Sequence, residues 1–118
     1  MKPDEDYRRH LAEGRFMLQR SRSSGNFVHP PRVAEPGSGA ADLAWAPASG
    51  LGTVHSVTIV RQKPPAQDYN VVLIDLDEGP RLMSRVVGIA PVDVKIGMQV
   101  RARIITEDDA PLLVFEKA

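Results

Sequence analysis

The clearest alternation of apolar and polar residues runs through residues 69–87, YNVVLIDLDEGPRLMSRVV. Val72, Ile74 and Leu76 occupy every second position, so they share one face of an extended strand. A second alternating run follows a Gly-Pro dipeptide, which supplies the positive-φ and fixed-φ residues that a tight turn needs. The pattern predicts an antiparallel hairpin with one buried face. Because an isolated hairpin is only marginally stable in water, other strands must cover it.

Further strands are expected before and after this hairpin. Residues 52–61 form a strand-like run, and two glycines at its start suit a bulge or a bend. Residues 90–97 are typical of one helical turn, 99–106 alternate apolar residues with arginines, and 112–115 form a last short apolar run. Five strands in this order predict a small barrel of the oligonucleotide/oligosaccharide-binding (OB) type, which leaves few exposed edges. A short sandwich is the structural alternative.

The N-terminal part of the chain predicts a short helix and a small subdomain. Acidic residues come first and basic residues later, before a glycine, which is the order expected of a helix. Strand-like runs occur at 16–19 and 27–29, whereas 34–41 lack a hydrophobic anchor and suggest a flexible loop. Trp45 is expected to anchor this subdomain on the barrel. The expected divisions are 1–14 for the helix, 15–48 for the subdomain and 49–118 for the barrel.

Composition excludes several classes of function. The 118 residues contain 15 basic and 15 acidic side chains, so the formal net charge is zero. A single-stranded nucleic-acid binder needs a basic groove with stacking aromatic residues, and this balance argues against such a partner. The absence of cysteine excludes disulfides and thiolate catalysis. Because no apolar run approaches membrane-spanning length, we expect a soluble, cytoplasmic protein with no membrane partner.

The sequence shows no catalytic constellation. His10, His29 and His55 do not have the spacing of a metal-binding pair. Carboxylates cluster at 75–78 and 107–109, where a solvated turn explains them better than an acid/base pair or a calcium loop. The serines near residue 21 have no accompanying histidine and acid, so nucleophilic catalysis is unsupported. We therefore expect no catalytic residues in this chain.

Two unrelated stretches, in the same order along the chain, carry a family resemblance. The first is LQRSRSSGNFVHPPRVAEPGSGAADLAW, which contains a Pro-Pro-Arg motif and an Asp-Leu-x-Trp ending. The second consists of GLGTVHSVTIV, LIDLDEGPRLMSRVVG and IGMQVRARI. Together they resemble acyl-CoA-associated proteins that pair an N-terminal helix and a rubredoxin-like zinc ribbon with a C-terminal OB-fold. The resemblance implies a mainly β fold in which the helix and ribbon precede a five-stranded OB-fold barrel.

The resemblance also implies that the ribbon has lost its zinc ligands. The four cysteine positions of the family fall on Ser21, Ser24, Glu35 and Ser38. Serine hydroxyls are poor ligands for structural zinc, which prefers thiolate or imidazole. We therefore expect a degenerate, metal-free ribbon without a cofactor, held by the packing on the barrel of Phe27, Pro30, Pro31 and Trp45. The alternative is that residues 21–41 are partly mobile or disordered.

The functional expectation comes from the same resemblance. Members of the family are non-catalytic companions of thiolase-fold enzymes, including thiolases, acyltransferases, retro-aldolases and hydroxymethylglutaryl-CoA synthase assemblies. We expect an accessory subunit in lipid metabolism that supports assembly and the acyl-CoA entrance, in a hetero-oligomer with a thiolase-fold subunit. A stand-alone module binding acyl-CoA or another small ligand is the alternative, and single-stranded nucleic-acid binding is a weaker one. The side chains expected to contact the partner or CoA are Phe27, Trp45, Arg61, Tyr69, Arg101 and Arg103.

Overall fold

The computed structural model describes residues 2–37, 39, 41–64 and 67–118. Helix α1 (Pro3–Ala12) begins with acidic residues and ends with basic ones, an order that complements the helix dipole. Its ten residues are too few for a stable isolated helix, so the burial of Leu11 against the core stabilises it. Within the described ranges, no helix is long and apolar enough to cross a membrane.

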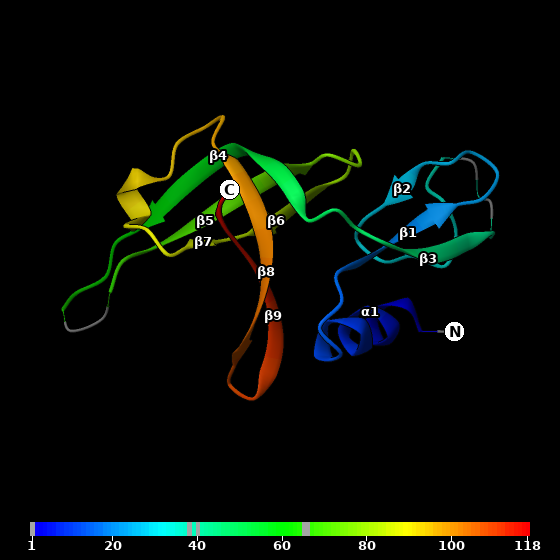
Figure 1. Cartoon of the computed structure of the whole chain (residues 1–118), viewed down its shortest axis with the longest axis horizontal. Helices are drawn as coiled ribbons and strands as arrows, with labels where there is room; N and C mark the ends of the chain where they lie inside the picture. Colours follow the sequence, from blue (N-terminus) through cyan, green and yellow to red (C-terminus); the bar gives the residue numbers. More distant parts are fainter. Residues whose placement is uncertain (1, 38, 40, 65–66) are drawn as a thin grey trace.

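A small three-stranded sheet follows the helix. Its strands are β1 (Met17–Ser21), β2 (Phe27–Val28) and β3 (Leu43–Pro47), in the antiparallel order β2-β1-β3 (Figure 1). β1 and β3 pair along their whole length. Leu18 of β1 is fully buried and belongs to the same hydrophobic core as the residues of the second sheet. The small sheet is therefore packed on the rest of the chain.

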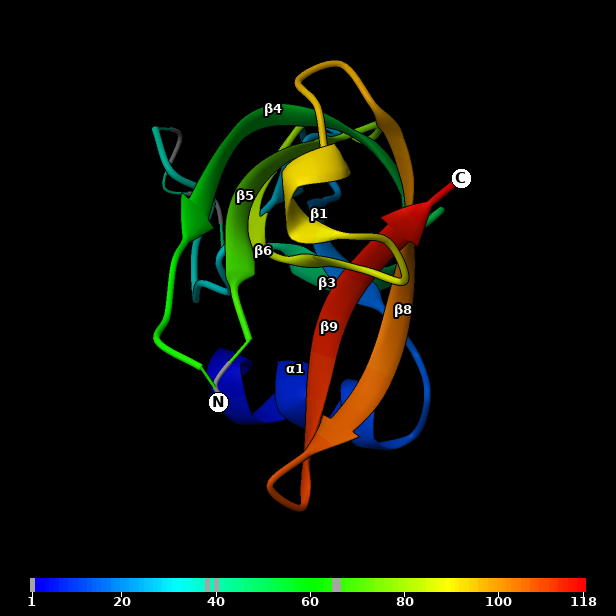
Figure 2. The ribbon, with the colours of Figure 1, turned by 90° about the vertical axis from the view of Figure 1, so that its left-hand side faces the viewer.

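The second sheet curls into a barrel (Figure 2). Its strands are β4 (Leu51–Val60), β5 (Tyr69–Leu76), β6 (Arg81–Ser84), β7 (Val86–Val87), β8 (Gln99–Glu107) and β9 (Ala110–Lys117). They lie in the order β6-β5-β4-β8-β9-β7, and the pairs are antiparallel except for β7 with β9, which is parallel. A 3-10 turn, η1 (Pro91–Asp93), lies where the sequence predicts a helical turn.

The core of the barrel is built from the positions that the alternating pattern predicts. Val72 and Ile74 are both 0% exposed and Leu76 is buried beside them, which confirms the buried face of the predicted hairpin. Val100 from β8 and Phe115 from β9 fill the opposite side of the barrel and are also fully buried. Burying a large aliphatic or aromatic side chain contributes about 1.5–3 kcal/mol, so these few positions account for much of the stability of the barrel.

The bulge in β4 lies within the strand rather than at its initial glycines, where the sequence predicted a bulge or a bend; Gly50, with a φ of 79°, fits the bend. The register with β5 shifts between Val54 and Ser56, which adds local twist and helps the strand curl. Gly52 instead allows a close approach between the two strands. A Cβ atom there would lie 2.7 Å from Ile74 Cγ2 and 2.9 Å from the carbonyl oxygen of Asp75.

Two strands differ in extent from the sequence-based prediction. The strand after the Gly-Pro turn breaks at Arg85, because the buried side-chain amide of Asn70 binds both backbone groups of Val86. The chain then continues as β7 beside β9. The last strand begins at Ala110 rather than at residue 112. Asp108 and Asp109 have φ angles of 52° and 62°, and this left-handed conformation makes a tight turn that extends the pairing of β8 and β9.

We expect Gly52→Ala to lower the free energy of unfolding by about 1–3 kcal/mol, because the added methyl group overpacks the contact with β5. Urea denaturation measures this change. Thr58→Ala, at an exposed position of the same strand, is the matched control and should change stability by less than about 0.5 kcal/mol. A Gly52→Ala chain as stable as the parent would show that the close approach is not required.

Candidate functional site

A polar network centred on Asp42 closes one end of the small sheet. Ser21, at the end of β1, is 0% exposed, and its hydroxyl donates to Asp42 Oδ1 at 3.1 Å. Asp42 Oδ2 accepts the backbone N–H of Ser23 at 2.7 Å and also the hydroxyl of Ser23. Asp42 thereby fastens the loop after β1 to the segment that enters β3.

A second group of hydrogen bonds fastens the long loop between β2 and β3. The Ser24 hydroxyl donates to Glu35 Oε2 at 2.6 Å, and Glu35 is only 6% exposed. The buried side chain of Gln19 binds the backbone of Arg32 twice, accepting from its N–H and donating to its carbonyl, each at 2.6 Å. These bonds satisfy polar groups that would be costly to bury alone. They also fasten Arg32 and Glu35, two described residues of this loop, to β1 and to the segment that follows it.

The hydrogen bonds favour the ionised form of Asp42. The Ser23 hydroxyl is the largest cause of the lowered pKa, and the Ser21 hydroxyl and the Ser23 backbone N–H add to it against partial desolvation. Because the folded-state pKa lies below the unfolded value of about 3.9, the stabilisation is complete above that pH. It is lost as the pH falls through the folded-state pKa.

The residues at the four positions that the resemblance assigns to zinc ligands do not suit zinc. Ser21, Ser24 and Glu35 are engaged in the hydrogen bonds above, and Ser38 lies outside the described residues. Hydroxyl groups are weak zinc ligands. The described residues contain no group of three or more histidine, cysteine or acidic side chains able to hold a metal ion. The hydrogen bonds link the loops at these positions, and a metal-free ribbon stays a prediction.

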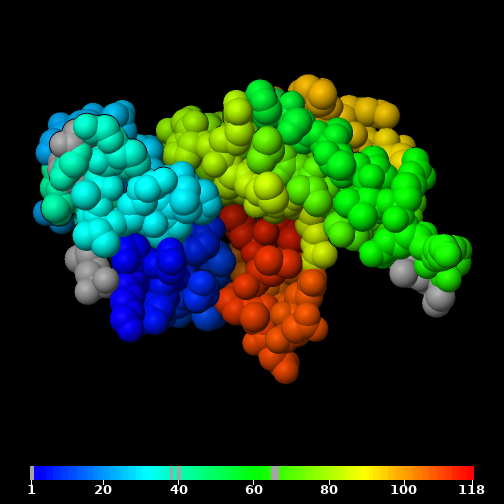
Figure 3. Space-filling model, turned by 180° about the vertical axis from the view of Figure 1, so that it is seen from behind, coloured from blue at the N-terminus to red at the C-terminus, as the bar shows by residue number. Residues whose placement is uncertain are grey.

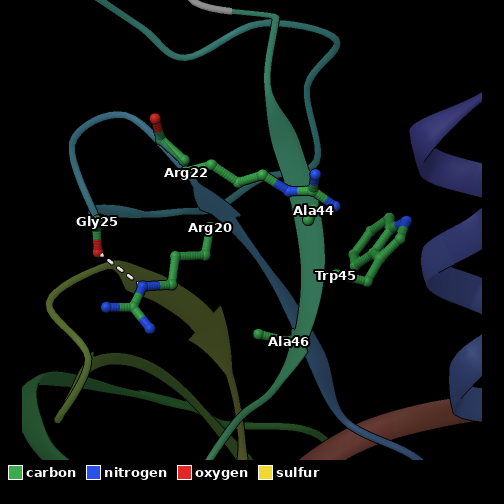
Figure 4. A pocket seen from close by; sticks show the side chains of 7 residues that line it. Arg20, Arg22, Gly25, Ala44, Trp45 and Ala46 are labelled. Atoms are coloured by element: carbon green, nitrogen blue, oxygen red, sulfur yellow. Dashed lines mark hydrogen bonds between the residues drawn. The ribbon is translucent and has the colours of Figure 1, made fainter.

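Trp45 lies against helix α1 (Figure 4), whereas the sequence analysis expected it against the barrel. Its ring centroid is 6.4 Å from that of Tyr7 and 5.2 Å from that of His10. Tyr7 also meets the ring of His29 edge-on at 5.6 Å. This aromatic cluster (Tyr7, His10, His29 and Trp45) fixes the helix on the small sheet. In the sequence, the spacing of Tyr7, His10 and Leu11 places these residues on one face of the helix, and this spacing could have predicted which face of α1 is packed.

Burial shifts two pKa values within the aromatic cluster. Desolvation raises the pKa of Tyr7 to about 12 and lowers the pKa of His29. His29 Nδ1 is buried without a hydrogen-bond partner among the described residues, so the neutral imidazole is the form that fits. The lowered folded-state pKa means that the contribution of His29 is complete above the unfolded value of about 6.5 and falls as the pH drops below it.

Arg20 and Arg22 flank a hollow of about 300 Å³ on the small sheet (Figure 4). Ala44 lies directly opposite Arg20 in the sheet and leaves room for the hollow. The Arg20 guanidinium lies over the ring of Phe27 at 5.2 Å and donates to the carbonyl of Gly25 at 3.1 Å. Among the described residues, no acidic side chain pairs with either arginine. Neither arginine stands in a sequence motif that predicts this arrangement, which depends on the pairing of β1 with β3.

The remaining expected contact residues lie on separate surfaces. Arg61 and Tyr69 flank the loop between β4 and β5, at the end of the barrel away from the small sheet (Figure 1). Arg61 pairs there with an aspartate of the same loop at 3.3 Å. Arg101 and Arg103 both pair with Glu116, at 3.1 and 3.6 Å, across β8 and β9. The structure therefore does not bring the six residues together, and their roles as contacts stay predictions.

We expect Asp42→Asn to lower the melting temperature at pH 7 by several degrees, because an amide cannot accept all the hydrogen bonds of the carboxylate. Excess EDTA should leave the melting temperature of the parent chain unchanged. Circular dichroism follows both changes, and Asp93→Asn at an exposed acid is the matched control. A clear loss of stability in EDTA, or stoichiometric zinc by elemental analysis, would contradict the metal-free ribbon.

We expect the free energy of unfolding to decrease as the pH falls below about 6.5, because the unfolded chain takes up a proton at His29 that the folded chain resists. One such group contributes a slope of at most about 1.4 kcal/mol per pH unit to the dependence of the free energy of unfolding on pH. His29→Phe should reduce this slope while keeping an aromatic ring against Tyr7, and Thr58→Ala should leave it unchanged. Denaturant titrations from pH 7 to pH 5 provide the test; an equal slope in His29→Phe would overturn the assignment.

Comparisons with known proteins identify the relatives of this chain. Residues 45–104 match the family described as the C-terminal OB-fold domain of ChsH2. A DUF35 domain-containing scaffold protein of Pyrococcus furiosus is 30% identical over 115 residues, which cover 92% of this chain and 85% of that protein. A chain of the solved structure described as Ltp2-ChsH2(DUF35) aldolase has a TM-score of 0.87 and 30% identity, covering 99% of this chain and 95% of that chain.

A longer relative contains a similar segment. The probable enoyl-CoA hydratase alpha subunit of Thermomonospora curvata is 38% identical over 89 residues, or 73% of this chain. This chain spans only 28% of the length of that protein. The matches confirm a mainly β protein with an N-terminal helix and an OB-fold domain. The chain belongs to the DUF35 family and carries an OB-fold domain of the ChsH2 type.

Proposed function

We propose that this chain is a non-catalytic accessory subunit of a thiolase-type enzyme complex that acts on acyl-CoA thioesters. The observation that carries the proposal is the nearly full-length match to a chain of the Ltp2-ChsH2(DUF35) aldolase, at a TM-score of 0.87. The name of that structure joins a DUF35 protein with a second protein, Ltp2, and with an aldolase. The scaffold name of the Pyrococcus furiosus relative supports the same kind of role.

The polar side chains of the barrel support a non-catalytic role. His55 Nδ1 lies 3.2 Å from Asp75 Oδ2, an arrangement that in enzymes orients a general base. Arg81 Nε, however, donates to the other oxygen of Asp75 at 2.6 Å and is the main cause of its lowered pKa. The hydrogen bonds of the described residues include none from a nucleophile to His55. This cluster therefore ties β5 to β6 and β4 and does not form a catalytic triad.

The relatives' lengths also favour a supporting module. The matching segment is a minor part of a hydratase subunit in Thermomonospora curvata, yet it makes up most of the scaffold protein in Pyrococcus furiosus. A module that occurs alone and within a longer subunit fits a role in assembly, because chemistry then resides in the other parts of each complex. We infer that the acyl-CoA thioester is recognised by the assembled complex, and that this chain supports its entrance.

One observation supports a second candidate function, the binding of acyl-CoA by the chain alone. Arg20 and Arg22 lack acidic partners among the described residues and flank the hollow of about 300 Å³. Guanidinium groups suit the phosphates of CoA. A stand-alone acyl-CoA binder would use this pair, whereas Arg101 and Arg103 are already paired with Glu116. The two functions differ in whether the isolated chain binds CoA.

We expect affinity purification of the tagged chain from its native cells to recover a thiolase-fold subunit in stoichiometric amount, identified by mass spectrometry. The isolated chain should neither turn over acyl-CoA nor bind CoA at micromolar concentration in calorimetry. The double substitution Arg20→Gln and Arg22→Gln should leave recovery of the subunit unchanged. Micromolar CoA binding by the isolated chain, abolished by that double substitution, would instead support the stand-alone binder, and turnover by the isolated chain would overturn the proposal.

A further inference from the structure

The barrel is incompletely closed between β6 and β9. β6 pairs with β5 on one side and stands at the end of the sheet order, so it is an edge strand. β9 pairs with β8, and β7 covers its other side only at Phe115 and Glu116. Among the described residues, the first half of β9 therefore has no strand partner facing β6. Edge strands with free backbone groups are natural sites for the addition of another strand.

Hydrogen-bond alternation shows which backbone groups of β6 face this gap. In an antiparallel pair, successive residues point their N–H and C=O groups alternately toward and away from the partner strand. The N–H of Leu76 donates to the carbonyl of Pro80 at 2.9 Å, so Leu82 and Ser84 also turn toward β5. Met83, between them, turns its N–H and its C=O outward. An incoming strand can therefore pair with Met83 without disturbing the β5–β6 hairpin.

The facing edge of β9 follows the same rule. The N–H of Phe115 donates to the carbonyl of Arg85 at 2.9 Å, so Leu113, two residues earlier, also faces the gap. The carbonyl of Leu113 accepts the hydroxyl of Ser84 at 3.0 Å, and this bond joins the two strands where the gap begins. Beyond it, toward Met83, no strand pairing joins β6 to β9 in the described residues.

Apolar side chains line the gap on both sides of Met83. One hollow of about 250 Å³ is lined by Tyr69, Met83 and Leu112, among others. A second, of about 230 Å³, is lined by Met83 and Leu112 together with Tyr7 and Leu11 of α1. Met83 is 71% exposed, so its side chain adds apolar surface at the rim of both hollows. In Figure 3, β9 in red lies between α1 in blue and the yellow-green residues of β6.

The backbone groups and side chains around the gap favour one kind of ligand over others. A lipid chain or another apolar ligand would cover the N–H and C=O groups of Met83 without bonding them, which is costly. Isologous pairing with a second copy, centred on Met83, would place Arg81 opposite Arg85 of that copy; both arginines already pair with carboxylates of their own chain, so no charge attraction would favour the second copy. An extended polypeptide segment supplies both the backbone partners and the apolar side chains.

We propose that β6 is a docking strand for an extended segment of the partner enzyme subunit, which pairs with the backbone of Met83 and inserts apolar side chains into the two hollows. The inference rests on the proposed function, because the segment belongs to the subunit that this chain accompanies. It adds the place and the mode of contact. It also gives a role to the exposed side chain of Met83, which lies outside every site that the sequence suggested.

Hydrogen exchange on the purified complex tests the pairing directly. The amide of Met83 should exchange at least about tenfold more slowly in the complex than in the isolated chain, because a new hydrogen bond protects it. The amide of Leu82 is the internal control, since it already faces β5 in both states. A complex in which the Met83 amide exchanges as fast as in the isolated chain would overturn the docking strand and leave the proposed function standing.

Two substitutions separate the backbone contact from the side-chain contact. Met83→Ala keeps the outward N–H, whereas Met83→Pro removes it, and an outward-facing position of an edge strand tolerates proline. We expect Met83→Pro to bind the subunit about tenfold more weakly than Met83→Ala, with the melting temperature of each chain confirming that it folds. Equal affinities of the two variants would overturn the proposal. Failure to find any enzyme subunit would overturn the proposed function and this inference together.

Discussion

The structure depends on covering the apolar face of β5 from every side. Val72 and Ile74 are completely buried, and β4 approaches β5 so closely at Gly52 that a methyl group has no room there. The curl of β4 then carries the sheet on to β8 and β9. Closure stops short at β6, because the chain leaves the hairpin at Arg85 to pair with β9 as β7. The same need for coverage therefore builds the barrel and leaves β6 as an edge strand.

The small sheet meets a different constraint, since it is too small to bury a core of its own. Leu18 reaches the core of the barrel, and the aromatic cluster attaches α1 to the other side. The loops are fastened by hydrogen bonds to two carboxylates, Asp42 and Glu35. In the zinc ribbons that the sequence resembles, a metal links such loops. In this chain polar side chains link the loops, and the lowered pKa of Asp42 makes the stability of this part depend on pH.

Local periodicity predicted the elements well, and the misses arise from contacts between distant residues. The strand at 69–76, the helical turn after the hairpin and the N-terminal helix follow from alternation, turn residues and capping order. The break at Arg85 depends on Asn70, which is far away in sequence. The network around Asp42 and the pairing of Arg101 with Glu116 depend on register in the folded chain. For the same reason, the sequence could not show that Met83 faces a gap.

The chain has the fold and the family of the DUF35 proteins, and its proposed role requires a partner subunit that supplies the chemistry. Native mass spectrometry of the chain purified from its own cells tests that role most directly. The account predicts a complex that contains this chain and a thiolase-fold subunit in a fixed ratio, with no mass attributable to zinc in this chain. Detection of the chain only as a 12.9 kDa monomer, with acyl-CoA bound or with enzymatic activity of its own, would contradict the accessory role.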